Sequence, residues 1–381
     1  MDDRILFDLL SPALPPAPPP AGVAFSGDRG EFRRLVTKGA ALELVTFGFY
    51  RFWLVTDIRR HLWSNTSLDG DAVEYTGRGK ELLIGFLFAL AILMPIYLGY
   101  FLIGVEAEQL QAFASIPLFI AFYAFGQFAI YRARRYRLTR TVWRGVRFWM
   151  DGSGWAYSLR AMFWGLLVVL TLGLALPWRE ASLERYKMQH SYYGELRGDF
   201  AGSGWEFFKR GWWLWLFGGI AIIIFPLAPF LYAEFKARQW RWWLSGIRMG
   251  GVRLESTLPH GALYGLYWKV IGWYVLLFVV FAIYLGGAAG LVYAAGGQAA
   301  MDPAMPGGGI PLMVLGVIGY IALALAFTAV MRIYLQRDLW AMVLESTHLH
   351  GIEVAVNVQA KGELASALGE GFADGLDVAG F

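Results

Sequence analysis

Long apolar runs without charge alternate along the whole chain with polar stretches rich in arginine and tryptophan. The clearest run, Leu82 to Val105, contains no charged residue and is longer than the roughly 20 residues that a helix needs to span hydrocarbon. In all, seven predominantly apolar segments are predicted to enter a membrane. They are residues 39–55, 82–105, 113–131, 161–178, 212–233, 270–293 and 310–331.

Two pairs of these segments are predicted to cross the membrane and return, at residues 82–131 and 270–331. The loops inside both pairs lack Lys and Arg, whereas each pair is followed by arginines, densest between Arg132 and Arg147. The positive-inside rule therefore places both loops in the periplasm and the arginine-rich ends in the cytoplasm. It also predicts a cytoplasmic C-terminus.

The other three segments lie singly between stretches that all contain Lys or Arg. The first is interrupted by Thr46-Phe47-Gly48, the second by Thr171-Leu172-Gly173, and the third by two prolines. If each segment crosses once, some basic stretches are periplasmic. If each enters and returns at its interruption, every basic stretch is cytoplasmic, but such a backbone must be covered by protein or line a cavity. Both alternatives stay open, and the apolar lengths favour about six to seven spans.

The polar stretches repeat one another. A shift of 75 residues places Thr66, Gly70, Gly77 and Gly79 on Thr141, Gly145, Gly152 and Gly154. Gly77 and Gly152 are therefore expected to share one backbone conformation, with positive φ. Strand-like segments recur beside these positions and are predicted to pair into a small cytoplasmic sheet. They lie near residues 70–76, 145–151, 196–202, 251–257 and 351–358.

These patterns predict an all-α polytopic membrane protein with short cytoplasmic β elements from internal repeats. Residues 1–22 are Pro-rich and are expected to form a disordered tail. Residues 23–360 form the repeated membrane domain. Residues 361–381 are expected to be a cytoplasmic C-terminal tail that includes a short acidic helix.

Composition strengthens the membrane interpretation. The 381 residues are 57% hydrophobic and only 16% charged, against about 25% charged in soluble domains. The chain contains 17 Trp and 19 Tyr, which suits the aromatic belts of membrane interfaces. It has no Cys, which excludes disulfides and thiolate chemistry. Basic and aromatic stretches beside apolar spans favour lipid head groups over nucleic acid as the partner, with self-association or another protein partner left open.

Polar residues inside apolar segments are the first functional candidates. They are Glu43, Arg51, Gln127 and Lys269. Glu43 is expected to pair with an arginine, to face a polar cavity, or to lie at the interface. The candidate contacts to lipid head groups are Arg132, Arg134, Arg135, Arg137 and Arg140, although these residues also suffice to set topology.

Residue patterns for enzymatic chemistry are weak. His348 and His350 would share one face of a strand, but further metal ligands are missing nearby. Gly77-Arg78-Gly79-Lys80 does not match a phosphate-binding loop, and an apolar span follows it. Ser64 and Thr66 near His61 are better explained as caps and turn formers than as a catalytic triad. We therefore predict no catalytic, cofactor-binding or metal-binding residue.

Several segments resemble a known family. FSGDRGEFRRL, TFGFYRFW, the long segment from Ile58 to Phe86 and the closing STHLHG are similar to the YjgN-like family, also called domain of unknown function 898. The resemblance covers nearly the whole chain after residue 24. It implies a polytopic protein of the bacterial inner membrane, and it implies no activity or catalytic residue.

Two function classes follow, and a membrane enzyme is a third. The leading hypothesis is transport or permeation of a small solute, ion or lipid, because interrupted membrane segments recur in transporters. The alternative is a non-transporting membrane scaffold that binds lipid or a partner protein through its cytoplasmic modules. A path or cavity that reaches Glu43 or Gln127 would favour the first. A solid bundle with cytoplasmic grooves would favour the second.

Overall fold

Ten short strands form a closed antiparallel barrel at one end of the molecule. The computed structural model describes residues 21–365 except 107, 224–227, 304 and 306. Each strand pairs with its neighbours in sequence, and the first strand pairs with the last to close the ring, with Ala21 opposite Leu349. The strands are β1 (Ala21–Phe25), β2 (Thr66–Leu68), β3 (Asp71–Tyr75), β4 (Thr141–Trp143), β5 (Val146–Met150), β6 (Ser191–Tyr193), β7 (Leu196–Phe200), β8 (Ile247–Met249), β9 (Val252–Ser256) and β10 (Thr347–His350).

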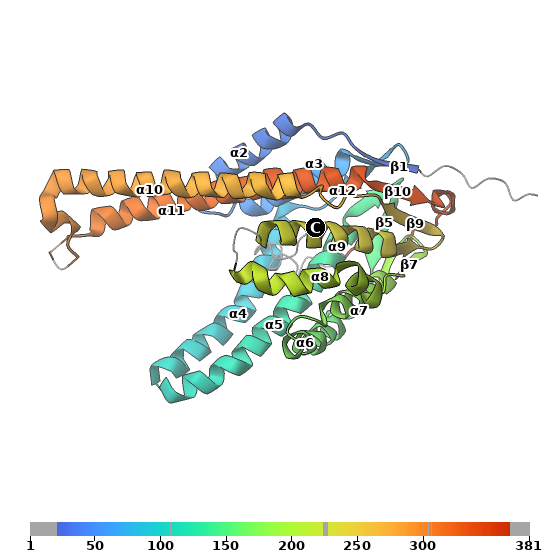
Figure 1. The fold of residues 1–381 in the computed structure, drawn as a ribbon, viewed down its shortest axis with the longest axis horizontal. Helices are drawn as coiled ribbons and strands as arrows, with labels where there is room; N and C mark the ends of the chain where they lie inside the picture. The colour runs from blue at the N-terminus through green and yellow to red at the C-terminus, as the bar shows by residue number, and fades with distance from the viewer. Residues whose placement is uncertain (1–20, 107, 224–227, 304, 306, 366–381) are drawn as a thin grey trace, which may run out of the picture.

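Helical hairpins connect the strands and extend away from the barrel (Figure 1). Three pairs are short and two are long, and the two long hairpins diverge from each other. The pairs are α2 (Arg29–Val45) with α3 (Arg51–Ser64), α4 (Gly79–Glu106) with α5 (Glu108–Thr139), α6 (Gly154–Leu170) with α7 (Leu176–Gln189), α8 (Gly204–Ile223) with α9 (Ala228–Gly246), and α10 (Tyr264–Met301) with α11 (Ile310–Val330). Helix α11 continues through a π-helical stretch, η2 (Met331–Asp338), into α12 (Leu339–Glu345).

Local chemistry explains the tight junctions between helices and strands. In four of the five strands of three or four residues, the first residue carries a hydroxyl that donates to the carbonyl four residues earlier, at the end of the preceding helix; the exception is β8, which begins with Ile247. This bond satisfies a helix-end carbonyl that would otherwise lack a partner. The four pairs are Thr66 with Leu62, Thr141 with Arg137, Ser191 with Lys187, and Thr347 with Val343, at 2.7–2.8 Å.

Two of the strand turns require positive φ at both central residues. Asp69-Gly70 and Arg144-Gly145 have φ of 53° and 85°, and of 48° and 74°. This geometry suits the twist of a two-residue hairpin. The expectation for Gly77 was wrong, because Gly152 has a φ of 81° and Gly77 does not lie in the positive-φ region. A Cβ at Gly77 would instead lie 2.5 Å from the Tyr75 hydroxyl, so close packing explains this glycine.

The barrel interior is filled by side chains. One hydrophobic cluster draws residues from all ten strands and includes the fully or nearly buried Trp143, Tyr193 and Leu349. Ile352 and Ala355 from a short 3₁₀ helix, η3 (Ile352–Ala355), pack into the same cluster. Among the described residues, the barrel therefore encloses a core packed by side chains from its strands and from η3.

The all-α prediction with six to seven spans is contradicted by this fold. Strands of three to five residues are too short to give a clear alternating pattern, so the sequence suggested a small sheet and missed the closed barrel. The expected strand at 351–358 is also wrong, because Gly351 turns the chain with a φ of 73° and η3 follows.

Four helices are long and apolar enough to cross a membrane. They correspond to Gly79–Leu102, Ser115–Thr139, Tyr264–Met301 and Ile310–Glu345 among the described residues. The other three expected spans are not single helices. Residues 39–55 and 161–178 each contain a helix end, a turn and the next helix start, and residues 212–233 are divided between α8 and α9.

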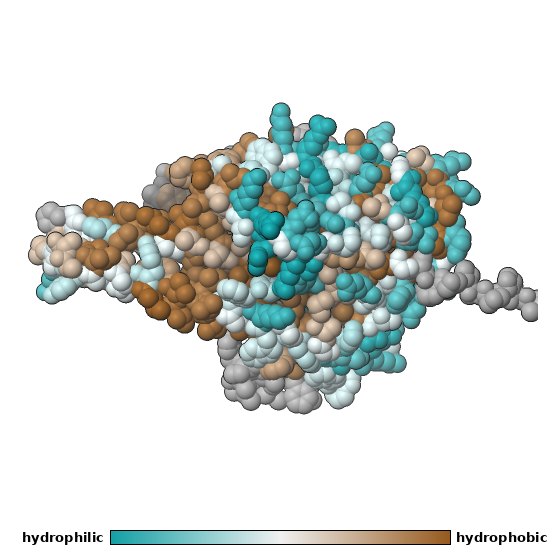
Figure 2. Space-filling view, turned by 90° about the horizontal axis from the view of Figure 1, so that it is seen from above, coloured by the Kyte–Doolittle hydropathy of each residue, from teal (hydrophilic) through white to brown (hydrophobic). Residues whose placement is uncertain are grey.

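Hydrophobic and hydrophilic surfaces are separated. Brown, hydrophobic residues cover the projecting hairpin, and teal, hydrophilic residues gather over the barrel half (Figure 2). The predictions of an N-terminal tail and a C-terminal acidic helix fall largely on residues 1–20 and 366–381, which lie outside the described residues. Within the expected tail, Ala21 and Gly22 already belong to β1.

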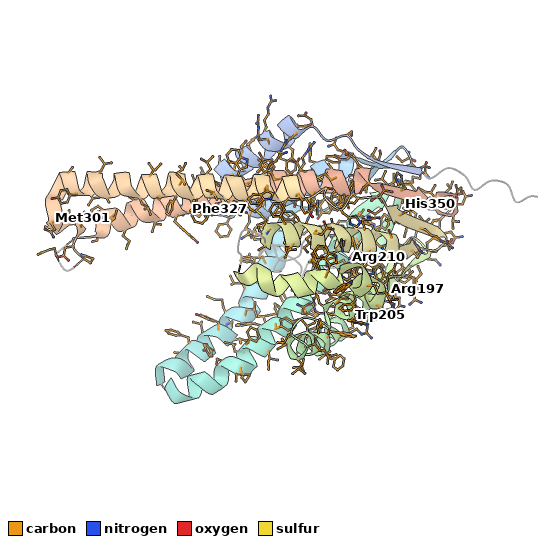
Figure 3. All side chains as sticks on the ribbon, in the orientation of Figure 1. Arg197, Trp205, Arg210, Met301, Phe327 and His350 are labelled. Carbon is orange, nitrogen blue, oxygen red and sulfur yellow. The ribbon has the colours of Figure 1, made fainter. Side chains whose placement is uncertain are left out.

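Reporter fusions test the orientation of this arrangement. Met301 lies at the far tip of a long hairpin and His350 lies at the barrel end (Figure 3). We expect fusions after Arg147 and Arg337 to report cytoplasm and fusions at Glu108 and Asp302 to report periplasm, because arginines are retained on the cytoplasmic side. Paired alkaline phosphatase and green fluorescent protein reporters measure this. Phosphatase activity after Arg147 would reverse the orientation.

Candidate functional site

Two adjoining cavities lie between the barrel and the inner ends of the helices. Their volumes are about 300 Å³ and about 450 Å³. Arg134, Trp240, Trp243 and Leu339 line both, so the two cavities are neighbours and together make up one candidate site. This size is within the range of pockets that hold small ligands.

The smaller cavity is mostly apolar and lies next to the barrel core. Four tryptophans are its largest lining residues. Trp63 and Trp340 stack with their ring centroids 4.8 Å apart. Their indole N–H groups donate to the hydroxyls of Thr141 and Thr66, both at 3.0 Å. The full lining is Trp63, Arg134, Arg137, Leu138, Thr141, Trp240, Trp243, Leu244, Ile247, Leu254, Leu339, Trp340, Val343 and Leu344.

The larger cavity is lined by more charged residues than the smaller one, and some of its lining residues are partly exposed. Its lining is Arg134, Glu180, Glu184, Lys187, Tyr232, Lys236, Gln239, Trp240, Trp242, Trp243, Tyr267, Met331, Leu335 and Leu339. Together the two cavities contain four cationic side chains and two carboxylates. The smaller cavity is therefore mostly apolar apart from two arginines, and the larger cavity holds charges of both signs, three cations and two carboxylates.

Arg134 connects the two halves of the site. One of its Nη atoms lies 3.8 Å from a Glu184 carboxylate oxygen, and the other lies 3.3 Å from the sulfur of Met188. Its Nε atom is buried without a hydrogen-bond partner. An unsatisfied buried donor on a cation favours an anionic or hydrogen-bond-accepting ligand.

Burial also changes the ionisation of the acidic and basic groups here. Burial lowers the pKa of Lys187, although Glu184 opposes the change. Burial alone would raise the pKa of Glu184, but Lys187 and Arg134 outweigh it, so the pKa of Glu184 is lowered. Burial lowers the pKa of Lys236 as well. An anion bound beside these lysines would favour their charged forms.

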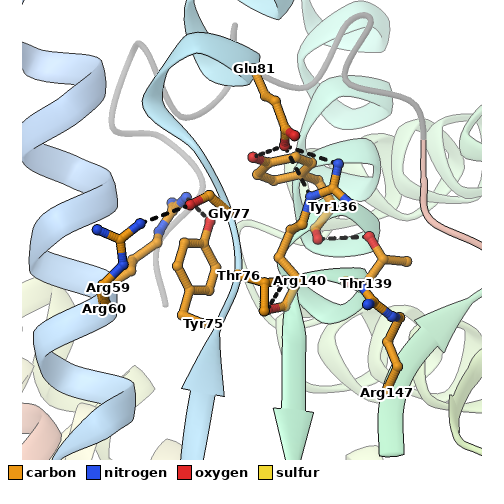
Figure 4. A network of polar contacts seen from close by, with 10 residues as sticks. All are labelled: Arg59, Arg60, Tyr75, Thr76, Gly77, Glu81, Tyr136, Thr139, Arg140 and Arg147. Carbon is orange, nitrogen blue, oxygen red and sulfur yellow. Dashed lines mark hydrogen bonds and ion pairs between the residues drawn. The ribbon is translucent and has the colours of Figure 1, made fainter.

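The remaining arginines of the predicted lipid-contact set differ in role. Arg140 is buried and binds Glu81 at 2.9 Å, and Tyr136 donates to the same carboxylate at 2.7 Å (Figure 4). Arg147 in the same network donates to the Thr139 carbonyl at 2.6 Å. Arg140 thus joins α4 to α5 and holds the barrel junction, which is a structural role.

Arg132, Arg135 and Arg137 lie on α5 beside Arg134, and of these three only Arg137 lines a cavity. Arg51 begins α3, Gln127 lies half-buried on α5, and Lys269 is exposed on α10. The structure does not bring Arg51, Gln127 and Lys269 into the cavities. Their proposed intramembrane roles stay predictions.

The comparison with family models decides which family the chain falls in. The model described as a bacterial protein of unknown function, DUF898, matches residues 20–236 and 227–373. The chain belongs to the DUF898 family. Searches of curated proteins and of solved structures found no match. Four membrane-length helices in a DUF898 protein are compatible with a membrane protein, and the inner membrane and the cytoplasmic C-terminus stay predictions.

Glu43 of this DUF898 protein is held by a partner that the sequence did not reveal. Both Glu43 oxygens bind Arg332 of η2, at 3.0 and 3.2 Å, and both side chains are buried. Arg51, the nearer candidate, does not form this pair. The separation of 289 residues explains why spacing could not find it.

The tryptophans and Lys187 were not among the predicted site residues. A signal was present, because Trp240, Trp242 and Trp243 lie within one basic aromatic stretch. That pattern also fits an interfacial belt, so only the packing of α9 over the barrel reveals a cavity wall. Among the described residues, no three His, Asp or Glu side chains converge as a metal ion would require.

Proposed function

We propose that this protein is a non-transporting membrane protein that binds an anionic lipid in the cavity between its barrel and its helices. The observation that carries the proposal is the lining of the site, which has an apolar end bordered by tryptophans and a charged end that holds Arg134, Lys187 and Lys236 together with two carboxylates. An anionic amphiphile has the same division between apolar chain and charged head.

The position of the cavity supports access from the bilayer. Tyr232 and Met331 are exposed and line the larger cavity, and Met331 follows directly after the apolar helix α11. Aromatic residues favour the depth of lipid head groups. A lipid at that depth would meet the charged end first and place its chain toward the barrel core.

The transport hypothesis gains less support from the described residues. The barrel interior is packed by a cluster from every strand. Glu43 forms a buried ion pair with Arg332. These observations leave the barrel without an evident path and favour retention of a ligand over its passage.

A lipid-binding experiment tests the proposal. Protein in detergent would be titrated with fluorescent phosphatidylglycerol and, separately, with fluorescent phosphatidylcholine. We expect preference for the anionic lipid. Arg134→Gln should weaken its binding at least about tenfold, since a hydrogen bond to a charged group contributes roughly 1.5–3 kcal/mol. Arg135→Gln is the matched control on the same helix, because Arg135 does not line either cavity.

A second variant tests whether the open volume of the cavities is needed, without changing their charge. Leu339 lines both cavities, so Leu339→Trp should reduce their open volume and weaken lipid binding without removing charge. Equal affinity for both lipids, or equal affinity of Arg134→Gln and Arg135→Gln, would contradict the proposal. Folding of each variant is checked by its elution and thermal unfolding.

A further inference from the structure

Two of the short hairpins have the same dimensions. Helices α2 and α6 each contain 17 residues, and α3 and α7 each contain 14. The turns that join them, residues 46–50 and 171–175, have equal length. Phe47 and Leu172 both have φ of 50°, and the glycine after each also has positive φ. Both turns lie at the ends of their hairpins away from the barrel (Figure 1).

The tips of both hairpins expose apolar side chains. Phe47 is 94% exposed and Leu172 is 93% exposed, and Val45 and Leu170 beside them are also exposed. Residues 44–50 and 161–178 contain no charged residue. In water such tips would be unfavourable, because an exposed large apolar side chain forgoes the favourable free energy of burial.

The backbone N–H groups of both turns are already satisfied. Each of the six consecutive N–H groups from Thr46 to Arg51 donates within its own hairpin, and so does each from Thr171 to Leu176. The hydroxyls of Thr46 and Thr171 also form hydrogen bonds within their own hairpins. They accept from Tyr50 and Ala175 and donate to the carbonyls of Leu42 and Leu167.

We infer that these two hairpin tips insert into the lipid leaflet nearest the barrel and turn back without crossing the bilayer. Hydrocarbon supplies no hydrogen-bond partners, so N–H groups that are already satisfied lower the cost of placing an uncovered turn there. At an aqueous surface or against a protein partner, the N–H groups of the turn would not need internal partners, because water or the partner could accept their hydrogen bonds. Satisfied N–H groups together with an uncharged, almost fully exposed apolar tip therefore point to lipid as the occupant.

Helix length supports insertion to partial depth. A 17-residue helix is about 25 Å long, whereas the 28 residues of α4 extend about 42 Å. All these helices begin at the barrel junction. The α4–α5 hairpin therefore reaches roughly 17 Å further, more than half of the roughly 30 Å hydrocarbon core. When the α4–α5 hairpin spans the bilayer, the short tips end within the nearer leaflet.

Single-cysteine labelling tests the inference, and the chain has no native Cys. Phe47→Cys and Leu172→Cys would be prepared in the full-length protein and reconstituted in nanodiscs. Glu74→Cys, exposed on barrel strand β3, is the aqueous control, and Leu291→Cys, exposed on α10, is the spanning-helix control. A water-soluble maleimide reports accessibility, and quenching of a thiol-linked fluorophore by lipids spin-labelled at different depths reports position.

We expect Phe47→Cys and Leu172→Cys to react at least about tenfold more slowly than Glu74→Cys, because a thiol in apolar surroundings ionises poorly. Quenching should place both labels inside the hydrocarbon of one leaflet. Rapid labelling, or no quenching at any depth, would overturn the inference. Labels at the opposite surface would show complete crossing and would also overturn it. Neither readout depends on lipid binding in the cavity, so it can fail independently of the proposed function.

Discussion

Arg332→Met should be among the most damaging single substitutions in the molecule, with a cost of about 3–5 kcal/mol of stability. The change leaves the Glu43 carboxylate buried without its partner, and an uncompensated buried charge is far more costly than a lost surface pair. Helix α2 and η2 would lose their shared contact at the same time. Folded yield after solubilisation and thermal unfolding followed by size-exclusion chromatography measure the effect.

A matched control comes from the same part of the fold. Arg29 pairs with Asp338 at 2.7 Å, but Arg29 is 48% exposed, so Arg29→Met should cost roughly 0–1 kcal/mol. The double variant Glu43→Leu with Arg332→Met should recover stability, since an apolar pair replaces a buried ion pair without leaving a charge. If Arg332→Met is no worse than Arg29→Met, the pair does not hold the fold.

Trp143→Ala should cost about 3–5 kcal/mol by opening a cavity in the barrel core. Trp143 is 3% exposed, its ring lies 5.5 Å from that of Tyr193, and the Tyr193 hydroxyl donates to the Trp143 carbonyl at 3.0 Å. The neighbouring Val142→Ala is the control, because Val142 alternates to the outer face of the same strand. Thermal unfolding and limited proteolysis measure the difference. Similar behaviour of the two variants would contradict a barrel core centred on Trp143.

The sequence was informative where a signal is local. Leu82–Val105 and the other long apolar runs correspond to spanning-length helices, because an uncharged run of that length has few alternatives. The family resemblance is confirmed by the DUF898 match. The two Thr-x-Gly interruptions in 39–55 and 161–178 marked the turns, although they were weighed against complete crossing.

Features that depend on distant residues could not be predicted. Barrel closure joins Ala21 to Leu349, and the ion pair joins Glu43 to Arg332. No regular spacing in the sequence predicts either contact. The cavity arises only when the ends of several helices meet over the barrel, so Trp63 and Trp340 gave no sign that they would stack. That the helix and strand hairpins are copies of one repeated sequence stays a prediction.

The closed ring also sets an order of events during synthesis. Strand β1 leaves the ribosome before the other nine strands, and its second partner, β10, follows 328 residues later at Leu349. At roughly 5–20 residues per second, one edge of β1 stays open for about 15–65 s. An unpaired edge attracts other strands, so the nascent chain needs protection at that edge until its last strand arrives. The final strand thus completes the barrel and ends the interval in which two chains could exchange strands.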